Sequence, residues 1–259
     1  MASAETSGSG DIARTLDLLW GSGPQPSRGP KPGLTLDRIV DAAVEVADAE
    51  GLAAVTMRRV ATEIGTGTMS LYRYLPGKAE LLDLMLDKVQ RPVDGGVEAV
   101  GGWRAALETL AYESLAQYRR HPWLTDINQS RPVLGPGAME GLEKVLGAIR
   151  PMGLPDRELV SVVMMISGHV LGVARTQLYQ QEAERKSGMT DAEFWQAQVP
   201  VLDRAIATGR YPIMAALSED AFSTDFDHFG FGLQRILDGL EHYVAQRDGG
   251  EERIRPIQR

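Results

Sequence analysis

Residues 56–75 constrain the fold of this chain more than any other stretch of its sequence. They read TMRRVATEIGTGTMSLYRYL, so one short run with helical periodicity ends at Gly65 and a second begins near Thr68. A glycine between two such runs indicates a tight turn between two helices. The second run opens with small polar and aromatic side chains, which suit a helix whose start lies in the major groove of DNA. The segment therefore predicts a helix-turn-helix.

The flanking residues supply the helices that such a motif needs. Leu36, Ile39, Val40, Ala43, Val44 and Ala47 form one apolar stripe at helical spacing. Thr35 is placed to cap this helix, which we expect over 36–50 with its end at Gly51. Thr56 caps a second helix, the third runs over 68–75, and Pro76 and Gly77 precede a fourth over 78–89. Three helices with a shared apolar side predict a small DNA-binding domain.

The rest of the chain is also predicted to be helical. Helical runs cover residues 103–120, 138–149, 156–179, 191–208 and 225–246, and no alternating strand pattern of convincing length is present. The fold class is therefore all-α, with an N-terminal three-helix helix-turn-helix domain and a larger helical domain. The predicted divisions are residues 1–33, 34–78, 79–248 and 249–259. The first is a linker in which residues 1–10 are disordered and 12–20 can form one short helix, and the last is a charged tail.

Composition limits what the protein can be. The chain has 259 residues, 43% of them hydrophobic, which is enough for a sizeable core. It has no cysteine, so disulfides and thiolate metal sites are excluded. We find neither a secretory signal nor a run of about 18 apolar residues. We expect a soluble, cytoplasmic protein that neither spans nor binds a membrane.

A net charge of −8, taken over the whole chain, opposes DNA binding. Phosphate attraction acts over only about 10 Å at 0.1 M salt, so the local balance matters more than the sum. Residues 56–78 contain four basic residues and one acid, Glu63. The surplus acid lies outside the helix-turn-helix, which leaves a basic face for DNA. Arg28 and Lys31 precede it, either as an arm for the minor groove or as incidental charges in a solvated linker.

Each residue of the motif is predicted to have a distinct role. Val60, Ala61, Ile64, Leu71 and Leu75 form the buried side. Arg58 is placed to contact guanine, while Thr56 and Lys78 stand at helix starts where phosphates bind. The remaining predicted DNA contacts are Thr68, Met69, Ser70, Tyr72 and Tyr74.

Structural roles remain open for the same residues. Thr56 can act as a cap alone, and Arg58 and Arg59 can belong to a solvated face. Tyr72 and Tyr74 lie about 200° apart on a helix, so one surface can bury at most one of them.

The sequence from Met57 to Leu82 resembles the DNA-binding domain of the tetracycline repressor (TetR) family. The resemblance rests on MRRVA, IG and TMSLYRYLPGKAELL, and extends over about residues 36–89. It implies a homodimeric, ligand-responsive transcriptional regulator, usually a repressor, on a near-palindromic double-stranded DNA operator. It also implies DNA contacts by Arg58, Thr68, Ser70, Tyr72, Tyr74 and Lys78. Gly67 replaces a larger polar residue of the tetracycline repressor itself, so the operator sequence does not transfer.

The helical body carries two apolar stripes, at residues 159–174 and 229–244. Taken by itself, each stripe is most simply interpreted as buried within one subunit. Members of the family dimerise through a bundle of two late helices from each subunit. The resemblance therefore assigns Phe231, Leu233, Leu237, Leu240 and Tyr243 to the dimer interface. A weaker likeness over SGHVLG and FGFGL implies a small-molecule cavity in the body. Candidate effector residues are Trp123, Met165 and His169, although a hydrogen-bonded core histidine is the simpler interpretation of His169.

Other functions find little support in the sequence. There is no phosphate-binding glycine loop and no Gly-x-Ser-x-Gly motif, so we predict no enzyme and no cofactor. The histidines lack metal-ligand spacing, so we expect no metal and no tetracycline–magnesium site. The alternative to a regulator is a helical protein-interaction module without DNA binding.

Overall fold

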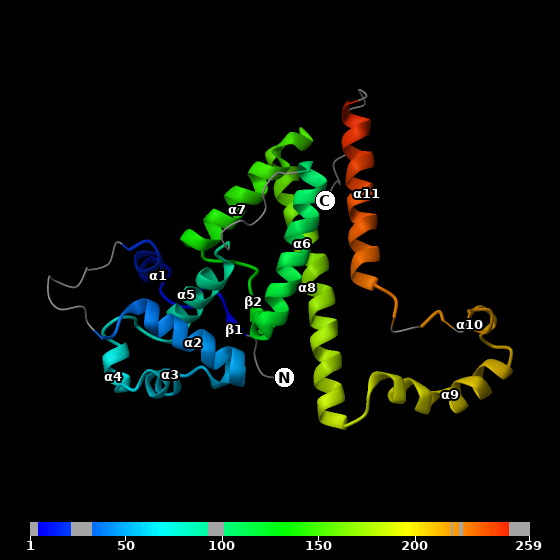
Figure 1. Cartoon of the computed structure of the whole chain (residues 1–259), viewed down its shortest axis with the longest axis horizontal. Coiled ribbons are helices and arrows are strands. Elements are labelled where there is room, and N and C mark those ends of the chain that lie inside the picture. The colour runs from blue at the N-terminus through cyan, green and yellow to red at the C-terminus, as the bar shows by residue number, and fades with distance from the viewer. Residues whose placement is uncertain (1–4, 22–32, 93–100, 219, 223–224, 249–259) are drawn as a thin grey trace, which may run out of the picture.

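The computed structural model describes residues 5–21, 33–92, 101–218, 220–222 and 225–248, and its regular structure is almost entirely helical (Figure 1). The predicted linker cations Arg28 and Lys31 lie outside the described residues. The helices, with short 3₁₀ turns between some of them, are α1 (Ile12–Leu19), α2 (Leu36–Glu50), α3 (Met57–Ile64), α4 (Thr68–Leu71), α5 (Lys78–Gln90), α6 (Gly102–Arg120), α7 (Pro136–Ile149), α8 (Asp156–Ser187), α9 (Asp191–Ala207), α10 (Pro212–Ala215) and α11 (His228–Asp248).

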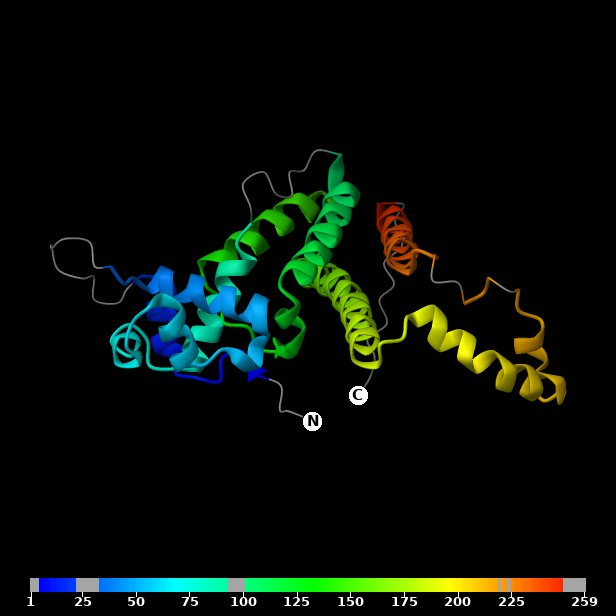
Figure 2. The same cartoon turned by 60° about the horizontal axis from the view of Figure 1, so that its bottom comes forward.

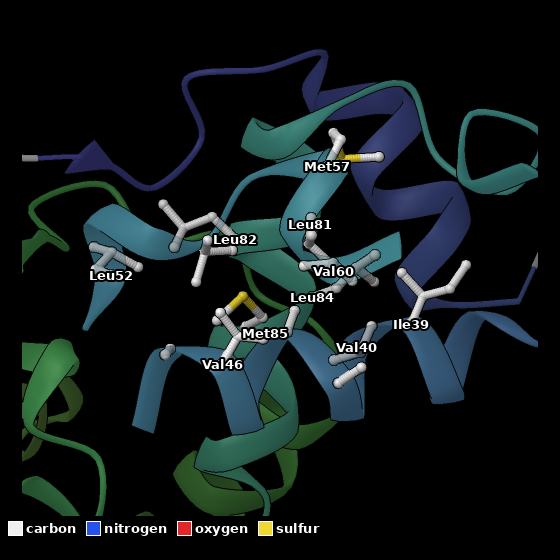
Figure 3. Packing of buried hydrophobic residues seen from close by; sticks show 14 of the residues in the cluster. Ile39, Val40, Val46, Leu52, Met57, Val60, Leu81, Leu82, Leu84 and Met85 are labelled. Carbon is white, nitrogen blue, oxygen red and sulfur yellow. The ribbon is translucent and has the colours of Figure 1, made fainter. Parts of the chain in front are cut away.

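Helices α2 to α5 form the N-terminal head, residues 33–92. Ile39 and Val46 of α2, Val60 of α3 and Met85 of α5 meet in one buried core (Figure 3). The predicted boundary after Lys78 falls inside this unit, because Leu81, Leu82, Leu84 and Met85 belong to the same core. The head therefore continues through α5.

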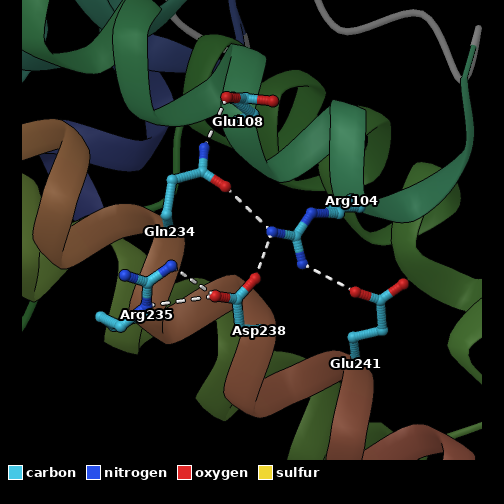
Figure 4. Close-up of polar contacts among 6 residues, drawn as sticks. All are labelled: Arg104, Glu108, Gln234, Arg235, Asp238 and Glu241. Atoms are coloured by element: carbon cyan, nitrogen blue, oxygen red, sulfur yellow. Dashed lines mark hydrogen bonds and ion pairs between the residues drawn. The ribbon is translucent and has the colours of Figure 1, made fainter.

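Helices α6, α7, α8 and α11 form the body, which has its own buried core. Leu107 of α6, Ile166 of α8 and Leu233 of α11 are fully buried in it. Polar contacts fasten α11 to α6: Arg104 donates to Asp238 over 2.6 Å and to Glu241 over 3.0 Å (Figure 4). Tyr118 packs against both cores, and burial raises its pKa.

Helices α9 and α10 form an arm, residues 191–215, that extends away from the body in both views (Figure 2). Neither helix has a buried residue. Large apolar side chains on the arm are nevertheless exposed, among them Phe194, Trp195, Leu202 and Ile213. Large exposed apolar patches are typical of interaction sites, so the arm is a candidate interaction surface.

Helix α8 is long and apolar enough to cross a membrane by length and composition, with a mean hydropathy of 1.5 over its best window. Its buried residues, including Leu159, Ile166 and Val170, pack into the body core. Helices α6, α7 and α11 lie against it, so α8 is the central helix of the body.

The N-terminal segment differs from its prediction. Residues 5–10 were expected to be disordered, but Glu5–Thr6 form strand β1, which pairs in parallel with β2, Ile127–Asn128. The following helix α1 confirms the helix expected over 12–20 and packs on α5. The all-α prediction is confirmed for the fold as a whole, with this two-residue pairing as the exception.

Candidate nucleic-acid interface

Helix α3 begins and ends as its sequence predicts. The hydroxyl of Thr56 accepts a hydrogen bond from the backbone N–H of Arg59 over 3.1 Å, and so caps the helix. Gly65 ends it with φ of 76°, in the left-handed region that favours glycine. Its N–H donates back to Ala61 and Thr62. This turn sets the direction in which α4 leaves.

Helix α4 is short, and one side of it is buried in the head core. Leu71 and, just after the helix, Leu75 are almost fully buried in the head core. Met69 and Tyr72 project outward, with 77% and 47% of their surface exposed. Thr68 and Ser70 are half-buried beside them. The predicted contacts at these four positions thus stay on an accessible surface.

The arginines around α4 fall into two groups: Arg59 is held in ion pairs, whereas Arg58 and Arg73 are exposed. Glu50 and Glu63 hold the guanidinium of Arg59 at 2.6 and 2.7 Å and raise its pKa further. Arg58 and Arg73 are exposed, and their guanidinium groups have no partner among the residues that the structure describes. Available cations attract phosphates, so Arg73 is a candidate that the sequence analysis left out.

Two predicted DNA contacts have partners within the chain. The hydroxyl of Tyr74 donates to the carbonyl of Leu34 over 2.9 Å, so it fastens the start of α2. Tyr74 is therefore a packing residue in this conformation, whereas Tyr72 is the outward one. The ammonium of Lys78 lies 2.8 Å from Glu5, so phosphate binding would require exchange of this ion pair.

The three predicted effector residues do not share a site. Trp123 is 2% exposed, and its indole N–H donates to Asp48 over 2.7 Å, where the body meets α2. His169 is hydrogen-bonded to the carbonyl of Phe229 over 3.0 Å and stacks on its ring, which fits a core histidine. Met165 alone lines an apolar groove of about 530 Å³ between α8 and α11.

The predicted dimer residues also separate into two groups. Leu233 and Leu237 are fully buried and Leu240 nearly so, all within the body core of one subunit. Leu233 and Leu237 therefore expose no surface to a partner, which contradicts their predicted place in the interface, whereas Leu240 also lines the groove between α8 and α11. Phe231 is exposed, and Tyr243 lines the α8–α11 groove. Arg235 lies over the Phe231 ring at 5.3 Å and lines the same groove.

Two families match most of the chain. Bacterial regulatory proteins of the tetR family match residues 39–85, which span most of α2 through most of α5. The tetracyclin repressor-like C-terminal domain matches residues 96–244.

Named relatives agree with these matches. The HTH-type transcriptional repressor DrrR1 of Streptomyces coeruleorubidus is 71% identical over 95% of this chain and 92% of its own. An HTH-type transcriptional regulator of Saccharopolyspora erythraea is 30% identical over 84% of this chain and 89% of its own.

A solved structure extends the likeness to the fold. ActR of Streptomyces coelicolor in complex with actinorhodin is 31% identical, with a TM-score of 0.69 over 84% of this chain and all of that one. Regulators of this family bind DNA operators as dimers and respond to small-molecule effectors. The chain belongs to the tetR family of bacterial regulatory proteins and is a helix-turn-helix, DNA-binding transcriptional regulator.

Proposed function

We propose that this protein is a repressor that binds a near-palindromic operator as a homodimer and leaves it when a small molecule binds the body. The observation that carries the proposal is the outward face of α4. Met69 and Tyr72 are exposed there while Leu71 is sealed into the core, and Arg58 and Arg73 flank them with available charge. We assign no catalytic role to the protein and place it in the cytoplasm, where it meets DNA.

We assign the contacts by chemistry. Tyr72, Ser70 and Thr68 present groups that bond base edges or phosphates, and Met69 suits a thymine methyl. Arg58 suits guanine through its planar fork. Thr56 and Lys78 bind phosphates, with Arg73 as a further cation.

A second subunit completes the dimer. Tyr243 lines the groove between α8 and α11, Phe231 is exposed on α11 beside the groove residue Arg235, and Met164 is exposed on α8. The α9–α10 arm adds apolar surface that one chain leaves uncovered. A dimer formed through this surface would place two α4 helices on one DNA face, about 34 Å apart.

The effector acts through the body. The relative ActR has been solved with actinorhodin. In this chain, a small molecule in the body would favour a subunit arrangement whose α4 helices no longer match adjacent grooves. Reciprocity then requires operator DNA to weaken effector binding by the same factor, typically about 5–150-fold. Equal effector affinity for free and DNA-bound protein would contradict this mechanism.

Selection of bound fragments from random DNA tests the proposal directly. We expect an inverted repeat with half-sites about one helical turn apart. Enrichment of no sequence, or of a single unrepeated site, would contradict a dimeric repressor.

Matched tyrosine variants then test the role of α4. Tyr72→Ala should abolish preference for the selected operator over unrelated DNA and leave the dimer intact. Tyr179→Ala is the control, because Tyr179 is also exposed but lies on α8. Equal loss in both variants, or in neither, would refute the assignment of Tyr72.

A further inference from the structure

Helix α5 carries three buried carboxylates along one side. Glu80, Asp83 and Asp87 are only 6%, 2% and 5% exposed. Their spacing of three and four residues places them on neighbouring turns of the helix. Buried charges need partners, and each of these has backbone or hydroxyl donors from another segment.

Two of the carboxylates hold the N-terminal strut, residues 5–21. Asp83 accepts from the hydroxyl of Ser7 over 2.7 Å and from the N–H of Gly8 over 3.1 Å. Glu80 accepts from the N–H of Asp11 over 3.1 Å. A Cβ at Gly10 would collide with the Glu80 carboxylate, so a larger residue there would push this side chain from its present position.

The same strut is bonded to the body. The N–H of Ser7 donates to the carbonyl of Asn128 over 3.1 Å, next to the pairing of β1 with β2. At its other end, the indole of Trp20 donates to the carbonyl of Leu134 over 3.2 Å. Ser7 thus contacts α5 through its side chain and β2 through its backbone.

The third carboxylate fastens the body to α5 directly. Asp87 accepts from the N–H groups of Gly137 and Ala138, over 3.1 and 3.0 Å, at the start of α7. One face of α5 is therefore fixed both to the strut and to the body. The first residue of this helix is Lys78, whose ammonium is paired with Glu5 of the strut.

We propose that the strut is a positioning element that fixes the angle of each head on the body. It lies outside the matched ranges 39–85 and 96–244. This inference rests on the proposed function, because a fixed head angle matters only when two heads must fit one operator. Without the strut, each head can still bind DNA and is still held by Asp87, but its angle on the body is less restricted, so the spacing of the two heads varies more.

Comparing a full operator with a half-site isolates this role. A full inverted repeat requires both heads at the correct spacing, whereas a half-site duplex occupies one head. We would measure both affinities at one salt concentration for the wild-type dimer and for Ser7→Pro. The substitution removes both the N–H bonded to Asn128 and the hydroxyl bonded to Asp83.

We expect Ser7→Pro to reduce the ratio of full-operator to half-site affinity about tenfold, equivalent to about 1.4 kcal/mol. Half-site affinity itself should stay the same. Ser9→Ala is the matched control, because Ser9 is exposed in the same segment. Glu5→Gln is a second control: by freeing Lys78 in each head it should raise half-site affinity, and raise full-operator affinity by at least the same factor, so the ratio should not fall.

Deletion of residues 1–10 is the second variant, in case Ser7→Pro does not fold, and it should lower the same ratio. An unchanged ratio in the folded variants would overturn the proposal. So would a parallel fall in both affinities, because that indicates general loss of structure. A wild-type protein with no preference for an inverted repeat would instead refute the proposed function.

Discussion

The head and the α9–α10 arm use the same apolar residue types in opposite ways. In the head, side chains such as Ile39, Leu71 and Leu81 are fully buried within one chain. In the arm, Leu202 and Trp195 are about half exposed, and Ile213 far more so. Burial of apolar surface drives folding, so these side chains stabilise the head from within its own chain. Neither helix of the arm has a buried residue, so we infer that its apolar side chains pack on a surface outside its own chain.

The contrast extends to the tryptophans. The indole of Trp123 is enclosed and hydrogen-bonded to Asp48, whereas Trp195 contacts Phe194 of its own helix and is 49% exposed. Enclosed aromatics stabilise a subunit, and open ones are typical anchors of interfaces. Apolar composition alone therefore does not reveal whether a side chain packs in the core of its own subunit or at an interface.

Replacing one leucine by alanine in each region should give the largest difference in the free energy of unfolding. Leu81→Ala should lower the free energy of unfolding by about 2–5 kcal/mol, because it leaves a cavity in the head core. Leu202→Ala should cost less than half as much, because its side chain is already partly in water. Urea denaturation at one fixed protein concentration measures both. Equal losses would erase the distinction between the regions.

The proposed packing of the arm on a second subunit predicts the next largest effect. Trp195→Ser should weaken dimerisation at least about tenfold, because large aromatic anchors dominate interface energies. The secondary structure should not change. Sedimentation over a range of concentrations measures the dimer, with Gln196→Ala as the exposed neighbour for control. A Trp195→Ser dimer as tight as the wild type would show that the arm lies elsewhere.

The head was predictable because its determinants are local. The caps Thr35 and Thr56, the turn at Gly65 and the apolar stripe of α2 all act within a few residues. The observed helix ends differ most from the predicted ends where tertiary contacts determine them. The third helix was expected to reach Leu75 but α4 ends at Leu71, and α8 continues to Ser187 rather than stopping near residue 179.

The rest depends on contacts distant in sequence. The Gly/Ser-rich start looks disordered because its partners, Glu80 and Asp83, lie about 70 residues away. The apolar stripe of α11 has the same pattern whether it faces α8 or another subunit, so Leu233 and Leu237 were misassigned. Gly10 was a usable signal, since glycine permits close approach of another group.

Variants at Lys78 and Glu5 test whether the Lys78 ammonium leaves Glu5 for a phosphate when the head binds DNA. Lys78→Ala should weaken binding to all sequences and flatten the log–log salt dependence by about one unit. Glu5→Gln should tighten binding without changing operator preference, because it frees the ammonium. Binding measured from about 50 to 200 mM salt provides the slope. An unchanged slope in Lys78→Ala would show that this lysine does not contact phosphate.

The smallest expected effect concerns the junction of the head with the strut. Burial raises the pKa of Asp83 above its ordinary value of 3.8, against opposing hydrogen bonds from Ser7 and Gly8. Folding therefore favours the protonated carboxyl. The stability that this group contributes is complete below about pH 4 and is lost as pH rises through its folded pKa.

Asp83→Asn cannot titrate, so its free energy of unfolding relative to wild type should improve as pH rises from about 4 through the folded pKa of Asp83, and then level off. Urea denaturation at several pH values and one protein concentration measures this difference. Asp17→Asn on α1 is the control for removing one negative charge nearby, because Asp17 is outside the buried stripe. The same pH slope in both variants would mean that net charge, and not burial at the strut, controls the titration.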